Sequence, residues 1–184
     1  MYSSRTLFII AAIVIGALTR LLPHPPNFTA IGALALFGGA YLSSRWLAVV
    51  VPVLAVFLSD VVINNTIYAQ DGQFVWMYEG AWLVYLSTAV CAVLGMFMLR
   101  KVNAGRVVSS SVVTALVFFI LTNFGVWAGS AMYPQTFSGL AECYIAAVPF
   151  LGWSVLGNLF FAGIFFGGFE FASRRFPKLA ARKA

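Results

Sequence analysis

Four polar side chains lie inside otherwise apolar runs of this sequence, and their types could do chemistry. Asp60, Glu79, Asn123 and Asn158 each stand among aliphatic, aromatic or small neighbours. Burying a polar group in a lipid bilayer costs free energy, so such residues often mark a binding site or an ion pathway. Each could equally make an ordinary hydrogen bond between helices, and that interpretation stays open beside the functional one.

Aromatic residues accompany two of these polar side chains. Glu79, Trp82 and Tyr85 follow a helical spacing of three, and Asn123 and Trp127 are four residues apart. These spacings place each set on one side of a helix. A carboxylate or amide beside aromatic rings suits a small ring-bearing solute with hydrogen-bonding edges, although aromatic residues at helical spacing are also typical of simple packing.

The sequence gives little support for catalysis. Its one histidine, His24, lies in a proline-rich turn, and Cys91 and Cys143 are isolated cysteines. No zinc-binding His-Glu-x-x-His motif, nucleophile elbow or Gly-rich phosphate loop occurs. We therefore expect no enzyme, no metal, no cofactor and no ATP hydrolysis by this chain. A membrane enzyme remains an alternative that would need His24, Asp60 and Glu79 to meet at the outer surface.

The composition is typical of an integral membrane protein. Of the 184 residues, 62% are hydrophobic and 9% are charged, whereas soluble domains carry about 25% charged residues. We expect an all-α polytopic membrane protein that forms a single integral membrane domain over residues 1–184. The net charge of +6 is explained by membrane topology, and we expect no nucleic-acid partner.

The apolar runs predict six transmembrane helices. A spanning helix needs about 20 mostly apolar residues, and the candidates are Thr6–Leu22, Phe28–Leu42, Trp46–Ile63, Trp76–Leu99, Val107–Met132 and Cys143–Ala172. The second is short and could cross only partly. Pro149 is expected to kink the last helix or to mark its true beginning.

The basic residues orient this arrangement. With six spans, ten of the eleven basic residues share one side: Arg5, Arg45, Arg100, Lys101, Arg106, Arg174, Arg175, Lys178, Arg182 and Lys183. The positive-inside rule assigns this side, with both termini, to the cytoplasm, which predicts a multi-pass protein of the bacterial inner membrane. The outer loops would be Pro23–Asn27, Asn64–Val75 with Asp71, and Tyr133–Glu142. A re-entrant pair replacing the second and third helices would preserve this parity.

The segment from Arg20 to Tyr41 joins a rigid turn to a small-residue helix. Its three prolines, Pro23, Pro25 and Pro26, cannot lie inside a regular helix. Many of the residues after Asn27 are glycine or alanine, which lets neighbouring helices approach the backbone closely. We expect this turn, with Asn27 at its end, to help shape a ligand pocket.

Several stretches resemble an uncharacterised bacterial membrane family assigned to transport. They are the proline turn with its small-residue helix at 20–40, Cys143-Tyr-Ile-Ala-Ala-Val-Pro-Phe, Leu156-Gly-Asn-Leu-Phe-Phe and Phe166-Gly-Gly-Phe-Glu. More remotely, the chain is similar to the substrate-binding S-components of energy-coupling factor (ECF) transporters. Those are six-helix proteins that bind vitamins or related micronutrients from the outer side and depend on a transmembrane scaffold with two ATPases.

This resemblance implies an S-component-like bundle and a scaffold partner. In S-components, an Ala-x-x-x-Ala pattern on the first helix packs against the scaffold, and the matching place here reads Ala12-Ile-Val-Ile-Gly16. Small residues four apart also favour close helix packing by themselves. Ala12 and Gly16 are therefore the candidate docking residues.

The sequence thus predicts a membrane transport subunit that binds a small solute from the outer side. The candidate binding residues are Asn27, Asp60, Glu79, Trp82, Asn123, Trp127 and Asn158. The alternative is a structural or assembly subunit of a larger membrane complex, without a pocket and with an exposed Gly/Ala helix face.

Overall fold

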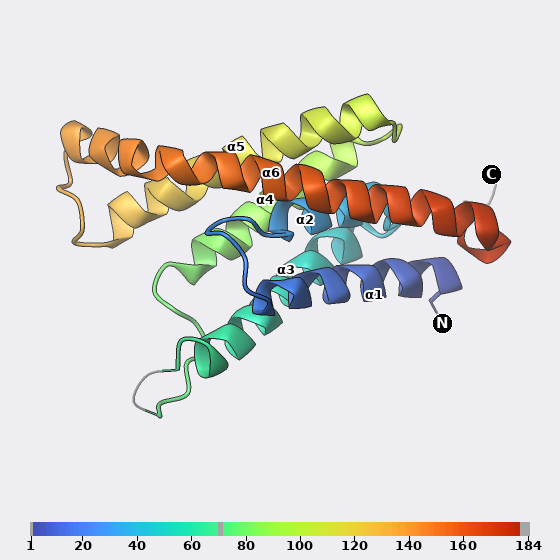
Figure 1. The fold of residues 1–184 in the computed structure, drawn as a ribbon, viewed down its shortest axis with the longest axis horizontal. Helices are drawn as coiled ribbons and strands as arrows, with labels where there is room; N and C mark the ends of the chain where they lie inside the picture. Colours follow the sequence, from blue (N-terminus) through green and yellow to red (C-terminus); the bar gives the residue numbers. More distant parts are fainter. Residues whose placement is uncertain (1, 70–71, 181–184) are drawn as a thin grey trace.

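A computed structural model describes residues 2–69 and 72–180, and within these ranges the fold contains helices and no strands (Figure 1). Asp71, Arg182 and Lys183, which entered the predicted topology, lie outside the described residues. The helices are α1 (Ser4–Leu18), α2 (Ile31–Tyr41), α3 (Arg45–Thr66), α4 (Ala81–Met98), α5 (Ala104–Gly129) and α6 (Phe137–Arg175), with single 3-10 turns η1 (Thr19–Leu21) and η2 (Pro177–Leu179).

Five helical segments in the described ranges are long and apolar enough to cross a membrane. They are α1 together with η1, α3, α4, α5 and α6. These segments indicate a multi-pass membrane protein. The longest, α6, has 39 residues and extends about 58 Å at about 1.5 Å per residue, well beyond a hydrocarbon core of about 30 Å.

The short helix α2 accounts for the difference from the six predicted spans. It has 11 residues and a length of about 16 Å, roughly half of the hydrocarbon core. Residues 22–30, predicted in part to be helical, form an irregular segment before it. In Figure 1 this segment and α2 together return the chain toward the end of the bundle where α1 began.

Helix α2 is the centre of the bundle. It packs against α1, α3, α4, α5 and α6, and every residue from Ile31 to Gly39 is buried. Where α2 crosses α4, a Cβ on Gly39 would lie 3.1 Å from the Gly95 Cα, and a Cβ on Gly95 would lie 2.9 Å from the Leu36 carbonyl oxygen. The two backbones touch because both residues at the crossing lack side chains.

The two described ends of the chain lie together. Arg5 Nη1 donates a hydrogen bond to the Leu179 carbonyl at 3.0 Å, which ties α1 to η2. In Figure 1 the α2–α3 and α4–α5 connections lie toward this same end, and the α3–α4 and α5–α6 connections lie toward the other. This is the grouping on which the predicted charge asymmetry depends.

Two helices begin five or six residues away from their predicted starts. Helix α4 begins at Ala81, not Trp76, because Gly80 has φ of 79° and turns the chain just before it. Helix α6 begins at Phe137, where the Thr136 hydroxyl accepts a hydrogen bond from the Gly139 backbone N–H at 3.1 Å. Pro149 therefore lies inside α6 and does not mark its beginning, and Glu142, predicted in a loop, lies in its first turns.

Candidate functional site

A cavity of about 310 Å³ lies at the N-terminal end of α2. It adjoins Arg20 at the end of α1 and the last turns of α5, away from the two described chain ends. Its walls come from the end of α1, the segment before α2, the segment before α4, and the facing sides of α4, α5 and α6. The lining residues are Arg20, Asn27, Thr29, Ile31, Gly32, Tyr78, Val84, Ala115, Phe118, Phe119, Thr122, Asn123, Val126, Ser154 and Asn158.

The short length of α2 leaves backbone donors at this cavity. The first helical N–H to reach a carbonyl is that of Leu34, which bonds Ala30 at 2.8 Å. Ala30 precedes the helix and supplies no side-chain cap. The N–H groups of Ile31, Gly32 and Ala33 therefore lack an acceptor within the helix, and the first two of these residues line the cavity.

Asn158 is the most buried polar side chain of the cavity wall. It is 5% exposed, and its Nδ2 donates to the Ser111 carbonyl at 3.2 Å and to Thr114 Oγ1 at 3.4 Å. These bonds tie α6 to α5. A Cβ on Gly32 would overlap the Asn158 amide, with the amide Cγ at 2.8 Å, so glycine at this position lets the amide lie directly against the first turn of α2.

The proline turn is held against α6 beside the cavity. The ring of Phe28 packs on Trp153, Phe160 and Phe161, with ring centres 5.6 to 6.4 Å apart. A Cβ on Gly157 would lie 2.9 Å from the Thr29 nitrogen, so the turn rests on the α6 backbone. This packing fixes Asn27 and Thr29 in the cavity wall.

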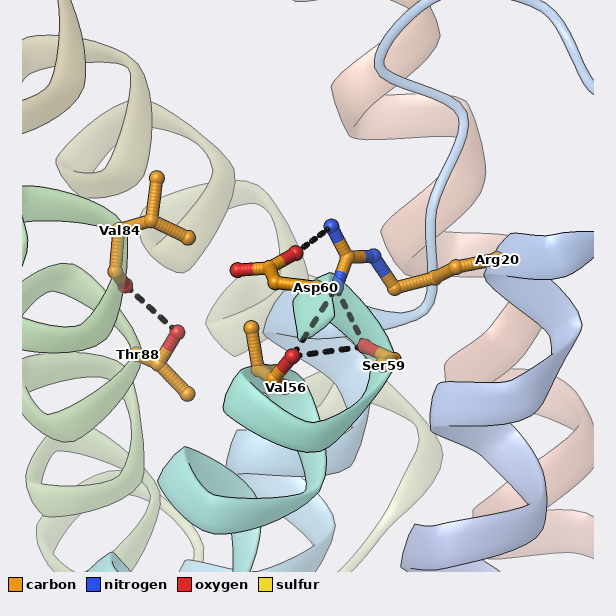
Figure 2. A network of polar contacts seen from close by, with 6 residues as sticks. All are labelled: Arg20, Val56, Ser59, Asp60, Val84 and Thr88. Carbon is orange, nitrogen blue, oxygen red and sulfur yellow. Dashed lines mark hydrogen bonds and ion pairs between the residues drawn. The ribbon is translucent and has the colours of Figure 1, made fainter. Parts of the chain in front are cut away.

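A buried ion pair supports the Arg20 side of the cavity (Figure 2). Arg20 Nη2 lies 2.6 Å from Asp60 Oδ1, with side chains 12% and 2% exposed. Arg20 Nη1 also donates to Ser59 Oγ at 2.5 Å and to the Val56 carbonyl at 3.3 Å. Arg20 lines the cavity and Asp60 does not. Asp60 therefore neutralises and positions the Arg20 guanidinium at the cavity wall.

The second carboxylate oxygen of this pair, Asp60 Oδ2, is buried without a hydrogen-bond partner among the described residues. The hydroxyl of Tyr85 on α4 is also buried outside hydrogen-bond geometry, but it lies close enough to Asp60 for the two groups to interact. Figure 2 shows that this free oxygen lies on the side of α4, where Thr88 donates to the Val84 carbonyl. The carboxylate therefore has a spare acceptor within the bundle.

Tyr78 contributes a neutral hydroxyl to the cavity wall. Burial raises the pKa of Tyr78 to about 12, and the nearby Asp60 carboxylate adds to this effect while Arg20 opposes it. The phenol is therefore protonated at neutral pH and can donate a hydrogen bond.

Five of the seven predicted binding residues are divided between two adjoining cavities, and Asp60 and Trp127 line neither. Asn27, Asn123 and Asn158 line the first cavity, whereas Glu79 and Trp82 line a second, of about 520 Å³, between α4 and α5. Tyr78, Val84, Thr122 and Val126 line both cavities.

Glu79 is not on one helical stripe with Trp82 and Tyr85. It lies in the exposed turn before α4, because the helix begins only at Ala81. Trp82 is 57% exposed, and Tyr85 packs edge-on against Phe57 of α3. Asn123 lines the first cavity while its Nδ2 donates to the Phe119 carbonyl of its own helix at 2.8 Å.

Trp127 fastens the turn between α5 and α6 and lines none of the described cavities. Its Nε1 donates to the Pro134 carbonyl at 2.9 Å, and the Gln135 amide donates to the Trp127 carbonyl. Trp127 therefore stabilises this turn, and its role in solute binding stays a prediction.

The candidate docking pair on α1 faces its own bundle. A Cβ on Gly16 would overlap the ring of Phe165 on α6, and Ala12 is half-buried against the core. Gly16 is thus used for packing within the bundle, and the docking of a scaffold at Ala12 and Gly16 stays a prediction.

Several cavity residues were missed by the sequence analysis, among them Arg20, Thr29, Tyr78, Thr122 and Ser154. Arg20 carried a usable signal, because it is the one basic residue outside the charged end. The hydroxyl residues carried none, since serine and threonine in membrane helices commonly bond their own backbone.

The acidic and histidine side chains that could do chemistry make separate contacts. Among the described residues there is no group of three His, Cys, Asp or Glu side chains that could hold a metal ion. His24 is exposed beside the Pro25 carbonyl, and Asp60 is held by Arg20; within the described part of the chain no hydrogen bond or ion pair joins either of them to Glu79. What the first cavity offers is a set of hydrogen-bonding groups in an apolar wall.

A model of a family of unknown function, DUF6580, matches residues 2–179. No curated protein and no solved structure matches the chain.

Proposed function

We propose a function for this chain, which belongs to the family of unknown function DUF6580. We propose that it is a membrane transport subunit. It binds a small uncharged or weakly charged solute in the cavity at the N-terminal end of α2. The observation that carries the proposal is this cavity of about 310 Å³, lined by both hydrogen-bonding and apolar side chains. Ligand sites typically have volumes of about 300–1,000 Å³ with a few convergent polar groups in an apolar wall.

The orientation that we propose makes the cavity accessible from the outer side. Of the nine basic residues that the structure describes, eight lie toward the end that holds the two described chain ends, and Arg20 does not; positive residues favour the cytoplasmic side. The cavity lies in the opposite half. In this proposal the protein lies in the inner membrane of a bacterium, with its binding site facing incoming solute.

Coupling to an energy source requires a partner in this proposal. The sequence has no phosphate-binding loop, so a separate scaffold with ATPases, as in an ECF-type transporter, would drive release to the cytoplasm. The internal packing of Gly16 against Phe165 argues that such a scaffold would contact a surface other than the Ala12–Gly16 pair.

Thermal-shift screening of purified protein against vitamins and related micronutrients tests the proposal. A ligand of the cavity should raise the unfolding temperature, and Ser154→Leu, at a residue that lines the first cavity and not the second, should reduce that rise. Ser173→Ala, far from the cavity on α6, is the control and should leave the rise unchanged. A ligand-induced rise that persists in Ser154→Leu and in further variants that fill the first cavity would contradict the assignment of this site.

A second function, that of an assembly subunit, is favoured by one observation. A Cβ on Gly163 or Gly167 would meet no atom within 4 Å, and both glycines line an open cavity of about 450 Å³ between α5 and α6. Purification in mild detergent distinguishes the two functions, because a stoichiometric membrane partner without ATPases, together with no ligand response, would support assembly.

A further inference from the structure

We propose that the cavity at the N-terminal end of α2 recognises an uncharged ligand through an amide-type edge, in which a hydrogen-bond donor and an acceptor stand side by side. Lactams, carboxamides and pyrimidinones present such an edge. The inference rests on the proposed function and adds the chemical class of the solute.

The protein donors are the first backbone N–H groups of α2. Those of Ile31 and Gly32 have no acceptor within the helix and no side-chain cap, and both residues line the cavity. Helical N–H groups point toward the N-terminal end of the helix, which is where the cavity lies. A ligand carbonyl can accept from them.

The protein acceptor is Asn158 Oδ1. The orientation of this amide is determined by its neighbours, because the Ser111 carbonyl can only accept, so the nitrogen must face it. Oδ1 therefore points away from α5. Among the contacts of the described residues it accepts no hydrogen bond, and it is not one of the fully enclosed unpaired atoms, so it keeps accessible surface at the cavity that Asn158 lines.

The donors and the acceptor are adjacent. Gly32 lies directly against the Asn158 amide, with the Cγ atom 2.8 Å from the position of an added Cβ. The free oxygen therefore stands beside the uncapped turn of α2. A ligand that offers a carbonyl next to an N–H can satisfy both groups at once.

The charges around the cavity favour an uncharged ligand over an anion. Its one ionised lining residue, Arg20, is already paired with Asp60 at 2.6 Å. A carboxylate ligand would compete with Asp60 for Arg20 and would also face Asn158 Oδ1, an acceptor that it cannot satisfy. The half-buried rings of Phe118 and Phe119 offer apolar surface to a flat ligand.

Two matched pairs of probes test the inference on the unmodified full chain in detergent. Uracil has the donor–acceptor edge and 1,3-dimethyluracil lacks the donor; benzamide is uncharged and benzoate is its anionic counterpart. Calorimetric titration should show uracil and benzamide binding on the order of tenfold more tightly than 1,3-dimethyluracil and benzoate, because an unmatched buried group loses about one hydrogen bond.

Asn158→Leu provides a second measurement. It removes the acceptor at similar volume, and Ser111 keeps the bonding of its carbonyl within α5. Discrimination between uracil and 1,3-dimethyluracil should fall to within about twofold. Asn65→Leu is the matched control: Asn65 makes three bonds of 2.8 Å to Val61 and Val75 outside the cavity, so its loss should lower stability and leave discrimination intact.

The outcomes separate this inference from the proposed function. Equal binding of uracil and 1,3-dimethyluracil, or tighter binding of benzoate than benzamide, overturns the amide-edge inference and leaves solute binding standing. If neither these probes nor any compound of the vitamin library binds the unmodified chain, the proposed function fails and the inference fails with it.

Discussion

Breaking the Arg20–Asp60 pair should be far more costly than breaking the exposed Arg174–Glu170 pair. The first has an N–O distance of 2.6 Å and side chains 12% and 2% exposed, and the second has a distance of 3.1 Å and side chains 77% and 58% exposed. Removing one partner of a buried pair leaves an uncompensated charge and costs about 3–5 kcal/mol. An exposed pair one helical turn apart contributes only about 0.3–0.5 kcal/mol.

The assay is a double-mutant cycle on both pairs, followed by thermal unfolding in detergent. Asp60→Leu alone should lower the free energy of unfolding by about 3–5 kcal/mol, which for a chain of this length is a fall of roughly 10 °C in Tm. Adding Arg20→Met removes the stranded charge, and because hydrophobic replacement of both partners is often neutral, the double variant should recover most of the loss.

The control cycle is Glu170→Leu with Arg174→Met, in which each variant should change Tm by about 2 °C or less. The reasoning is refuted if Asp60→Leu is no more destabilising than Glu170→Leu. It is also refuted if the effects of Asp60→Leu and Arg20→Met simply add, because the charges would then be stabilised independently of each other.

Three further predictions test the packing, the titration and the topology. Gly39→Ala should destabilise the fold by about 1–3 kcal/mol, because an added Cβ meets the α4 backbone, whereas Gly163→Ala, with open space around it, should have almost no effect in thermal unfolding. The pKa of Tyr78 is raised from 10.0 to about 12 in the folded protein, so its contribution to stability is complete below pH 10 and lost as the pH rises toward about 12. Because Tyr78 is 38% exposed, solvent screening makes this contribution small; Tyr78→Phe should slightly flatten the alkaline decline in unfolding experiments, and an unchanged profile would contradict the raised pKa. A cysteine introduced at Met132 should react with a membrane-impermeant thiol reagent added to intact cells, and one at Lys101 should not; the reverse labelling would overturn the proposed orientation.

The all-helical fold and the sorting of the loops to two ends of the bundle could be predicted from the sequence, because both depend on properties summed over many residues. Apolar runs of about 20 residues indicate spanning helices whatever their neighbours are. Boundaries depend on single residues, and they were predicted less well. The left-handed φ of Gly80 delays α4 to Ala81, and this displaced Glu79 from the helix that its spacing with Trp82 had suggested.

Part of the cavity wall could be anticipated from the sequence for a similar reason. Asn158 could be selected because an amide deep in an apolar helix is costly without a partner. Its hydrogen-bond partners, Ser111 and Thr114, could not be predicted, because they depend on how α5 and α6 cross. The Arg20–Asp60 pair joins residues 40 positions apart, and both were visible as charges without any indication that they meet.

The small residues of α1 and α2 show the limit of reading a motif without its neighbours. The spacing of Ala12 and Gly16 predicts a close helix contact, and Phe165 of the same chain supplies it. In α2 the same kind of composition lets α4 approach at Gly39 and Gly95. The pattern specifies that something packs closely, and only the fold specifies what.

The half-length of α2 connects the fold to the site. A helix that begins inside a membrane protein exposes unpaired backbone N–H groups at a depth where lipid cannot satisfy them, and such a start is tolerated only when it is enclosed by protein or lines a polar cavity. Here α2 is enclosed by five neighbouring helices, and its first turn lines a cavity with Asn158 and Thr29. A full-length second helix would occupy that space and bond its own donors. The cavity and its hydrogen-bonding capacity are therefore both consequences of where α2 begins. The chain enters the bundle through the proline turn and the irregular segment 22–30, and becomes helical only at Ile31.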